Sequence, residues 1–438
     1  MITRIKSLTS HAGFRRYGAN TAWMFSEQIL RMIAGLLVGI WVARYLGPEQ
    51  FGIFSYALAF TGIFSGIAKL GLDGIIVRDL LNDPGKRDFY LGTAFWLKIA
   101  GALLAFTVIT IASFFTSNDT LTNLYIFIIA SGMIFQSFEV IDFYFQSKIL
   151  SKFVSISKMT QLFISSLLKI YFVLTGADLI WFVFISAFDQ FTLAICLIYA
   201  YRKQSIGYFI YHFNFSIAKR LLFNSWPLIF GSLVVMIYMR IDQIMIKEML
   251  GAKEVGIYSA AVRLSEVWYF IPTIIASSIF PAILAAKQQG QQVYHMRLQQ
   301  FYTVMAWLAI SIAVPMTFLS DWIIVLLYGA AYSEAGSVLM INIWTTLFVF
   351  IGVAFGRYLT AENLTKTQLY RTLFGAVVNV ILNLILIPIY GIKGAAIATF
   401  FAQFSANFIY DIFDPKLYPQ LKLKILAIIN PLSIKGIK

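Results

Sequence analysis

Ionisable side chains inside long apolar stretches are the residues of this chain best placed to do chemistry. A charge at the centre of a membrane helix costs about 2.5–3.5 kcal/mol on insertion scales, so it needs a partner or a water-filled cavity. Glu27 and Arg31 are four residues apart with the acid first, which favours an ion pair on one helix. The other such residues are Lys98, Glu139, Asp142, Lys169, Asp189, Arg240, Asp242, Arg263 and Glu266.

The cations among them indicate an anionic ligand. Guanidinium groups bind phosphate oxygens through paired hydrogen bonds. Arg31, Arg240 and Arg263 lie deep in their stretches, and we expect them to line a cationic lumen. Lys98 and Lys169 are further candidates for binding the anion. For Lys98, close to the end of its stretch, a structural salt bridge or snorkelling to the interface is the favoured interpretation.

The acids leave two roles open, because each could neutralise an arginine or bind a coupling ion, H⁺ or Na⁺. Arg240 and Asp242 are two residues apart and point in different directions, so they cannot simply neutralise one another. Arg263 and Glu266, three apart, share a helix face. Glu139 and Asp142, near the end of their stretch, are expected to be structural. The candidates for ion coupling are Glu27, Asp189, Asp242 and Glu266.

The sequence offers no pattern for an enzyme site. A single cysteine and three histidines show no metal-ligand spacing, and no nucleophile has a base beside it. We therefore expect neither a catalytic set nor a metal or other cofactor. The net charge of +14 could suggest nucleic acid, but the charges are thinly spread between apolar runs, so membrane orientation explains them better.

The elements that must position these residues are membrane helices. Hydrophobic residues make up 60% of the 438 and charged residues 12%, so the solvent for most of the chain must be lipid. Stretches of about 20 apolar residues predict an all-α integral membrane protein with twelve transmembrane helices. They lie near 21–44, 51–70, 90–115, 121–145, 155–175, 178–200, 222–247, 255–285, 298–320, 335–357, 368–390 and 392–411.

The distribution of Lys and Arg predicts the orientation. The two ends and the even-numbered connections hold 25 of these residues, whereas the odd-numbered connections hold only four. Because positive loops stay inside, both termini are expected to be cytoplasmic.

A repeated turn predicts an internal duplication. The stretch "YLGPEQFGIFSYA" (45–57) returns as "MLGAKEVGIYSAA" (249–261), six helices later and hence on the same side of the membrane. The alternative is a convenient helix start with small residues for close packing. Duplication is favoured and predicts two parallel six-helix repeats. The expected parts are a cytoplasmic segment 1–20, a bundle 21–200, a cytoplasmic linker 201–221, a bundle 222–411 and a cytoplasmic tail 412–438.

Three stretches resemble one transporter family. "ARYLGPEQFGIFSYALAF", "NSWPLIFGSLVVMIYMRIDQIMIKEMLGAKEVGIYSAAVRLSE" and "PIYGIKGAAIATFFAQF" are similar to the polysaccharide-exporting branch of the MOP (MATE-like) superfamily, closest to Wzx-type O-antigen flippases. The resemblance implies a transporter that moves undecaprenyl-pyrophosphate-linked oligosaccharide across the bacterial inner membrane. It also implies contact with membrane lipids and with other polysaccharide-assembly proteins.

Alternatives remain open at this point. A membrane-bound polymerase or glycosyltransferase is disfavoured, because the periplasmic connections are short and the histidines lie in cytoplasmic segments. A MATE-type exporter of cationic drugs shares the fold and would favour the acids over the arginines. Within the flippases, capsule, exopolysaccharide and teichoic-acid precursors are alternatives to O-antigen.

Overall fold

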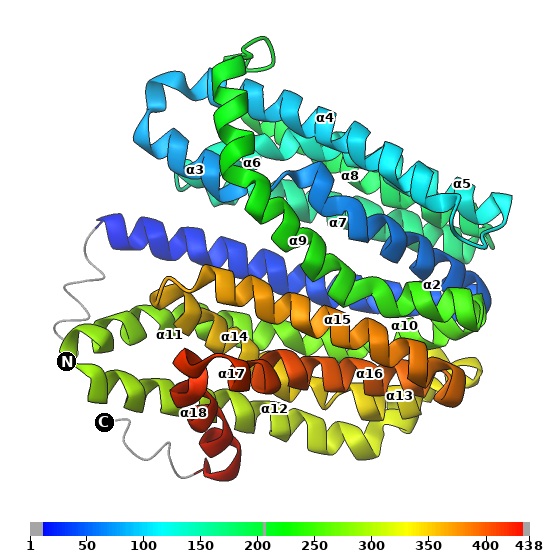
Figure 1. The fold of residues 1–438 in the computed structure, drawn as a ribbon. Helices are drawn as coiled ribbons and strands as arrows, with labels where there is room; N and C mark the ends of the chain where they lie inside the picture. The colour runs from blue at the N-terminus through cyan, green and yellow to red at the C-terminus, as the bar shows by residue number, and fades with distance from the viewer. Residues whose placement is uncertain (1–11, 205–206, 432–438) are drawn as a thin grey trace. The chain divides into compact units, whose positions relative to one another are not determined.

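The computed structural model describes residues 12–204 and 207–431, with side chains from residue 23 onward. Across these residues the chain is almost entirely helical and contains no strand (Figure 1). Residues 1–11 of the predicted N-terminal segment, 205–206 of the linker and 432–438 of the tail lie outside the described residues.

The helices form two compact units. Among the described residues, unit 1 holds those up to Tyr45 and Ala57–Met236, and unit 2 holds Leu46–Tyr56 and those from Ile237 onward. The bounds predicted for the two bundles, 21–200 and 222–411, stay predictions.

Unit 1 is built mainly from helices that precede the linker, and its apolar core lies around Leu91, Phe145 and Leu221. Two helices, α2 and α9, belong partly to each unit. The elements are α2 (Ala12–Lys69), α3 (Asp73–Asn82), η1 (Pro84–Lys86), α4 (Arg87–Ser113), α5 (Thr120–Ser131), η2 (Gly132–Glu139), α6 (Val140–Ser147), α7 (Ser151–Leu174), α8 (Leu179–Lys203) and α9 (Phe215–Met249).

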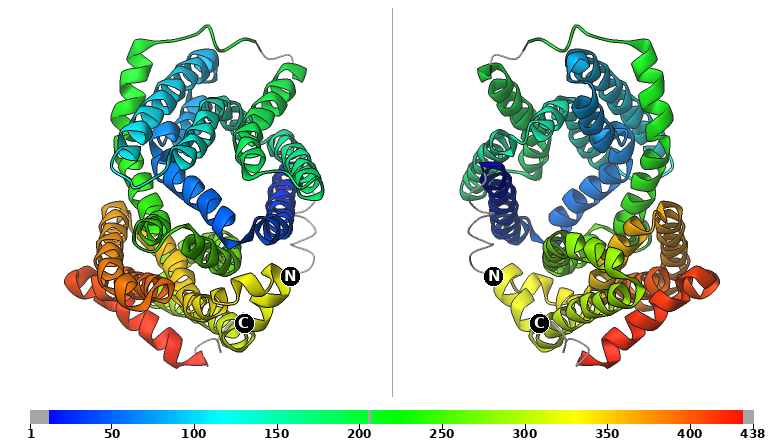
Figure 2. Two further views of the ribbon diagram at one scale, coloured as in Figure 1. Left: turned by 90° about the vertical axis from the view of Figure 1, so that its right-hand side faces the viewer. Right: turned by 90° about the vertical axis from the view of Figure 1, so that its left-hand side faces the viewer.

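Unit 2 has its apolar core around Tyr302, Phe350 and Phe355. Helices α15 and α16 lie side by side (Figures 1 and 2). The elements are α10 (Ala252–Glu266), η3 (Val267–Tyr269), α11 (Phe270–Gln289), α12 (Gln291–Tyr328), η4 (Ala330–Tyr332), α13 (Ala335–Asn342), α14 (Thr345–Ala361), α15 (Thr365–Tyr390), α16 (Ile392–Phe404), η5 (Ser405–Ile409), α17 (Tyr410–Phe413), η6 (Pro415–Leu417) and α18 (Tyr418–Ile429).

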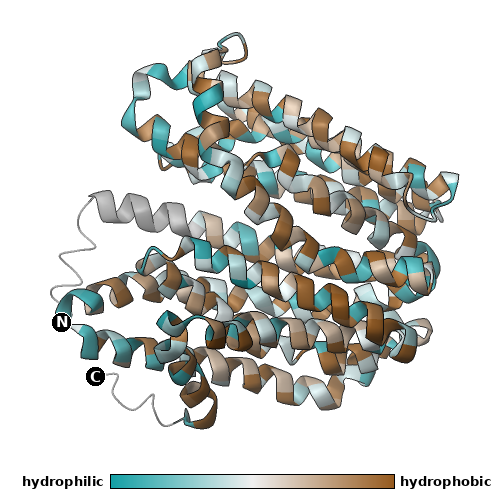
Figure 3. Cartoon of the chain, viewed as in Figure 1, coloured by the Kyte–Doolittle hydropathy of each residue, from teal (hydrophilic) through white to brown (hydrophobic). Residues whose placement is uncertain are grey.

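Nine helical segments of the described chain are long and apolar enough to cross a membrane. The first of them, Trp23–Asn82, has 60 residues and is broken at Gly47, where two separate spans were predicted. Apolar residues run along α4, α12 and α15, and hydrophilic residues gather at α3 and at the start of α4 (Figure 3). The all-helical membrane fold is thus confirmed, while the count of twelve stays a prediction.

The predicted tail contributes to unit 2 rather than extending from it. Helix α18 packs on α12, and the fully buried Lys424 pairs with the carboxylate of Asp411 on α17. The Tyr302 hydroxyl donates to Gln420 Oε1 at 2.8 Å. Burial lowers the pKa of Lys424 to about 8, which leaves it charged at neutral pH. No span was predicted in the tail, and α18, with 12 residues, is too short to cross a bilayer.

The repeated turn has a geometric reason. Gly47 and Gly251 hold the equivalent positions and both have positive φ, 70° and 112°, which an L side chain rarely adopts. Gly52 and Gly256 then meet across the two copies. A Cβ added to Gly52 would lie 1.8 Å from the carbonyl oxygen of Ala252, and one added to Gly256 would lie 1.9 Å from that of Pro48. The two helix starts therefore cross backbone to backbone.

This crossing predicts that neither glycine tolerates a methyl group. We expect Gly52→Ala and Gly256→Ala each to lower the thermal midpoint and the membrane abundance, because overpacking costs about 1–3 kcal/mol or more. Gly62→Ala is the control, since nothing lies within 4 Å of its added Cβ. Size-exclusion chromatography after a thermal ramp measures all three, and equal midpoints would contradict the crossing.

Candidate functional site

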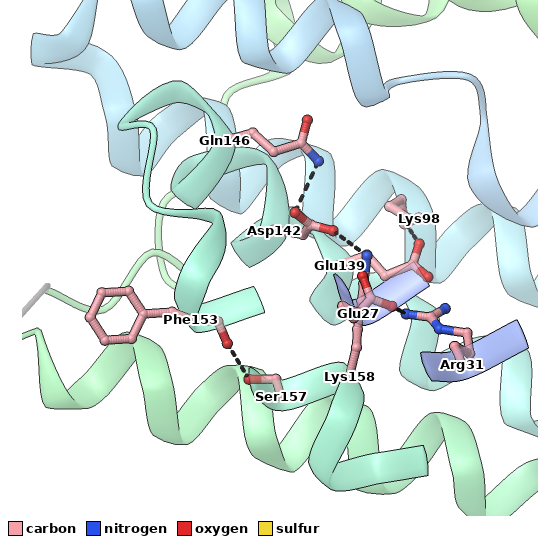
Figure 4. A network of polar contacts seen from close by, with 9 residues as sticks. All are labelled: Glu27, Arg31, Lys98, Glu139, Asp142, Gln146, Phe153, Ser157 and Lys158. Carbon is pink, nitrogen blue, oxygen red and sulfur yellow. Dashed lines mark hydrogen bonds and ion pairs between the residues drawn. The ribbon is translucent and has the colours of Figure 1, made fainter. Parts of the chain in front are cut away.

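The ionisable residues predicted inside the spans of unit 1 form oppositely charged pairs, several of which are drawn in Figure 4. Glu27 pairs with Arg31, as their spacing predicts. Lys98, whose side chain is fully buried, has Nζ 2.9 Å from Glu139 Oε2. Glu27 and Arg31 are neighbours on α2, whereas Lys98 on α4 and Glu139 on η2 come from elements distant in the sequence. The structural role expected for Lys98 and Glu139 fits this pairing.

Two further pairs follow the same pattern. Lys158 on α7 lies 3.2 Å from Asp142 on α6, and Gln146 donates to the same carboxylate at 2.9 Å. Lys169 on α7 lies 3.4 Å from Asp189 on α8 and donates to Ser165 Oγ at 2.8 Å. Since each charge is compensated, these pairs add no net charge to the apolar part of unit 1. The roles of Lys98 and Lys169 in binding substrate stay predictions.

The two arginines predicted inside the spans of unit 2, Arg240 and Arg263, differ in their partners. Arg240 on α9 lies 3.5 Å from Glu266 on α10, so Glu266 pairs across helices and not with Arg263, its neighbour on the same helix face. The Arg263 guanidinium instead stacks over the ring of Phe51, 4.9 Å from its centroid. No carboxylate of the described chain lies within 4.0 Å of Arg263. Of the five cations predicted inside spans, Arg263 alone lacks an acidic partner among these residues.

Asp242 is the centre of a buried polar cluster. Its Oδ2 accepts from the Tyr258 hydroxyl at 2.8 Å and from Thr399, and its Oδ1 accepts from Asn383 Nδ2 at 2.6 Å. Asn383 also donates to Asn379 Oδ1 at 3.2 Å. Asp242 is 5% exposed and both asparagines are fully buried. As the sequence indicated, Asp242 does not neutralise Arg240, and its partners here are all uncharged.

Oxygen atoms in and beside this cluster lack partners. Asn383 Oδ1 and Asn342 Oδ1 are buried with no hydrogen-bond partner in the described structure. A cavity of about 40 Å³ is lined by Asp242, Glu266, Asn342 and Thr399, among others. That volume accommodates a water molecule or a small ion. Carboxylate, amide and hydroxyl oxygens are the donors that hard cations prefer.

Sequence reasoning found Asp242 but missed its partners. A signal was present for the asparagines, because "NVILN" places Asn379 and Asn383 one turn apart in an otherwise apolar helix. Tyr258 and Thr399 gave no comparable signal, since aromatic and hydroxyl residues are common in membrane helices. Only the packing of α9, α10, α15 and α16 brings these five residues together.

Comparisons with known proteins agree with this architecture. Residues 17–287 match the family described as polysaccharide biosynthesis protein, and residues 227–385 match the MatE family. A solved inward-facing multidrug MATE transporter of the MOP superfamily shares the fold at a TM-score of 0.72 and 15% identity, over 90% of this chain and 95% of that one. The lipid II flippase MurJ shares it at 0.68 and 20% identity, over 93% and 91%.

Relatives by sequence extend over most of the chain. "Capsular polysaccharide biosynthesis protein CapF" of Staphylococcus aureus is 22% identical over 91% of this chain and 99% of its own length. "Probable flippase AglR" of Haloferax volcanii is 25% identical over 86% and 79%. The fold and these matches define a multi-pass membrane transporter of the MOP superfamily. Within it, the chain belongs to the polysaccharide biosynthesis protein family, the polysaccharide flippases.

The buried pair in unit 1 gives a stability prediction. Lys98→Met removes the partner of Glu139 while keeping much of the side-chain volume. We therefore expect the free energy of unfolding to fall by about 3 kcal/mol. The double variant Lys98→Met/Glu139→Gln should recover most of that loss because no charge is left unpaired. Lys86→Met at the exposed Lys86–Asp83 pair is the control and should change little. Thermal unfolding in detergent compares the three variants with the unmodified protein. Equal thermal midpoints for Lys98→Met and the double variant would contradict the pairing.

Proposed function

We propose that this protein moves an oligosaccharide linked to a polyprenyl pyrophosphate from the cytoplasmic to the periplasmic leaflet of the bacterial inner membrane by alternating access. The observation that carries the proposal is the uncompensated charge of Arg263. A cation without an acidic partner is costly inside a membrane protein, so an anionic ligand is the natural compensation. A pyrophosphate carries about two negative charges and accepts paired hydrogen bonds from a guanidinium.

Arg240, in unit 2 like Arg263, completes the proposed anion site, and Arg31 of unit 1 keeps the anion-binding role that the sequence predicts for it. Each is held by an acid in the resting structure, Arg240 by Glu266 and Arg31 by Glu27. In the proposal the pyrophosphate competes with these acids for the arginines, while the polyprenyl tail stays in lipid. Lys98 and Lys169 keep their predicted roles in binding the anion, for which each would have to leave its acidic partner. Release follows when the acids regain the arginines.

The cluster around Asp242 suits a coupling cation. We propose Na⁺, with H⁺ as the alternative, held by Asp242, the side-chain oxygen of Asn383 and the hydroxyl of Thr399. The unpartnered Asn383 oxygen and the uncharged partners of Asp242 support this assignment. A bound cation would neutralise Asp242 and supply the charge that its present partners do not. Glu27, Glu266 and Asp189 are already paired with cations and are weaker candidates.

O-antigen repeat units are the substrate that the resemblance of the three sequence stretches favours. The name of the Staphylococcus aureus relative points instead to capsule, and exopolysaccharide and teichoic-acid precursors share the same lipid carrier chemistry. All of these substrates present the same anionic head group to Arg263. Other membrane proteins of polysaccharide assembly would deliver and receive the substrate.

A second candidate is export of cationic drugs. The match of residues 227–385 to the MatE family and the buried carboxylate of Asp242 favour it. A drug-susceptibility assay separates the two functions. A flippase leaves resistance unchanged when it is expressed, whereas an exporter raises it.

The anion site predicts a graded response at one residue. In cells lacking the protein, the surface polysaccharide should be lost and its lipid-linked repeat unit should stay on the cytoplasmic side. Arg263→Ala should fail to restore the polymer, and Arg263→Lys should restore part of it, because Lys keeps the charge but not the fork. Arg44→Ala, at an exposed position, should restore it fully. Immunoblots of polymer and of protein abundance provide the readout, and full export by Arg263→Ala would exclude the site.

The cation site predicts an ion-specific stabilisation. NaCl should raise the thermal midpoint of the purified protein more than KCl at the same ionic strength, because a ligand that binds only the folded state stabilises it. Asp242→Asn should abolish the difference, and Asp189→Asn should preserve it. If the two salts act alike on the unmodified protein while transport still follows pH, the coupling ion is H⁺ and the Na⁺ assignment is wrong.

A further inference from the structure

A groove in unit 2 combines an apolar floor with a polar end. It lies between α11 and α12, next to the turn at Gly290 that joins them, and has a volume of about 440 Å³. Its apolar part is formed by Ile279, Ala282, Ile283, Phe301 and Val304. A group the size of a water molecule, such as a methylene, takes about 30 Å³. The groove therefore has room for roughly fifteen such groups. That matches most of one acyl chain.

Arg297, Gln300 and Gln289 form the polar end. The Arg297 Nη1 donates to the Oε1 of the buried Gln300 at 3.3 Å, which orients the guanidinium. No carboxylate of the described residues lies within 4.0 Å of Arg297. A guanidinium has five N–H donors, and this bond occupies one of them. The groove therefore presents an oriented cation without an acidic partner.

The depth of the groove matches a lipid. Helix α12 has 38 residues, about 57 Å of helix, which exceeds a hydrocarbon core of about 30 Å. Counted from Tyr328 at its far end, Val304 lies about 36 Å and Arg297 about 46 Å along the helix. A bilayer with its head groups is about 40–45 Å thick. With Tyr328 at the opposite surface, the apolar part ends near the edge of the hydrocarbon and Arg297 lies at the outer edge of the head groups.

A second groove shows what the polar end adds. In unit 1, residues of η2, α7 and α8 line a groove of about 450 Å³ with apolar and aromatic side chains alone, among them Phe135, Phe172 and Trp181. It offers no ligand for a head group, so any lipid chain could cover it. The groove between α11 and α12 differs by its cation, and charge complementarity selects an anionic occupant.

We propose that this groove binds an anionic phospholipid, with its phosphate at Arg297 and one acyl chain along α11 and α12. The lipid comes from the leaflet predicted to be cytoplasmic, since the α11–α12 turn is one of the basic connections. The site is distinct from the transported substrate's site at Arg263. Its occupancy by lipid stabilises the end of the α11–α12 hairpin.

Spin-labelled lipids test the proposal on the full chain in nanodiscs of phosphatidylcholine. Labelled phosphatidylglycerol should show a larger motionally restricted fraction than labelled phosphatidylcholine, with an affinity about five-fold higher, because one surface cation contributes about that factor. Arg297→Gln should remove the preference. Lys366→Gln, at an exposed lysine predicted on the same side, should keep it.

A second variant keeps the test independent of the arginine. Ala285→Trp at the exposed rim of the groove should fill it and reduce the restricted phosphatidylglycerol while leaving Arg297 in place. Equal affinity for the two lipids in the unmodified protein would overturn the proposal. A preference for spin-labelled polyprenyl phosphate over phosphatidylglycerol would overturn it too, since the groove would then serve substrate. Because the readout is lipid binding by resting protein, it does not depend on transport.

Discussion

Placing a charge in a low dielectric is costly, and that constraint explains the arrangement of ionisable residues in both units. Arg31, Lys98 and Lys169 each have an acidic partner, and so does Arg240. Such pairs hold helices together without giving the interior a net charge. Arg263 departs from the pattern, because stacking on an aromatic ring compensates a cation only partly. In the proposed function, this exception is where the anionic group of the substrate binds.

The same constraint makes the cluster around Asp242 informative. The carboxyl group of Asp242 accepts hydrogen bonds from hydroxyl and amide groups, and no cationic side chain of the described residues pairs with it. A cation would complete it. Unit 2 thus contains a guanidinium at Arg263 and a carboxyl group at Asp242 that each lack an oppositely charged partner among the described residues, with the Arg240–Glu266 pair on the same two helices. If the two proposed sites bind their ligands, each binding event would change the local charge, which gives the proposed coupling between them a physical basis.

Much of the fold followed from local patterns in the sequence. Apolar stretches locate the long helices, and the glycine turns at Gly47 and Gly251 mark the repeat. Close packing and duplication are compatible explanations of the repeated turn, because Gly52 and Gly256 each pack against the other copy of the turn. The sequence did not reveal the docking of α18, whose buried Lys424 looked like an ordinary tail charge. Nor did it show the pairing of Arg240 with Glu266, since spacing along one helix says nothing about neighbouring helices.

Reconstituted transport tests the central claim most directly. Purified protein is placed in vesicles whose lumenal leaflet carries a polyprenyl-pyrophosphate-linked oligosaccharide, and a membrane-impermeant lectin reports the sugar that reaches the outer leaflet. We expect lectin binding to rise with time in vesicles holding the unmodified protein and to stay at the level of empty vesicles with Arg263→Ala. Equal rates for the two proteins, or no rise with either while both are folded and inserted, would contradict it.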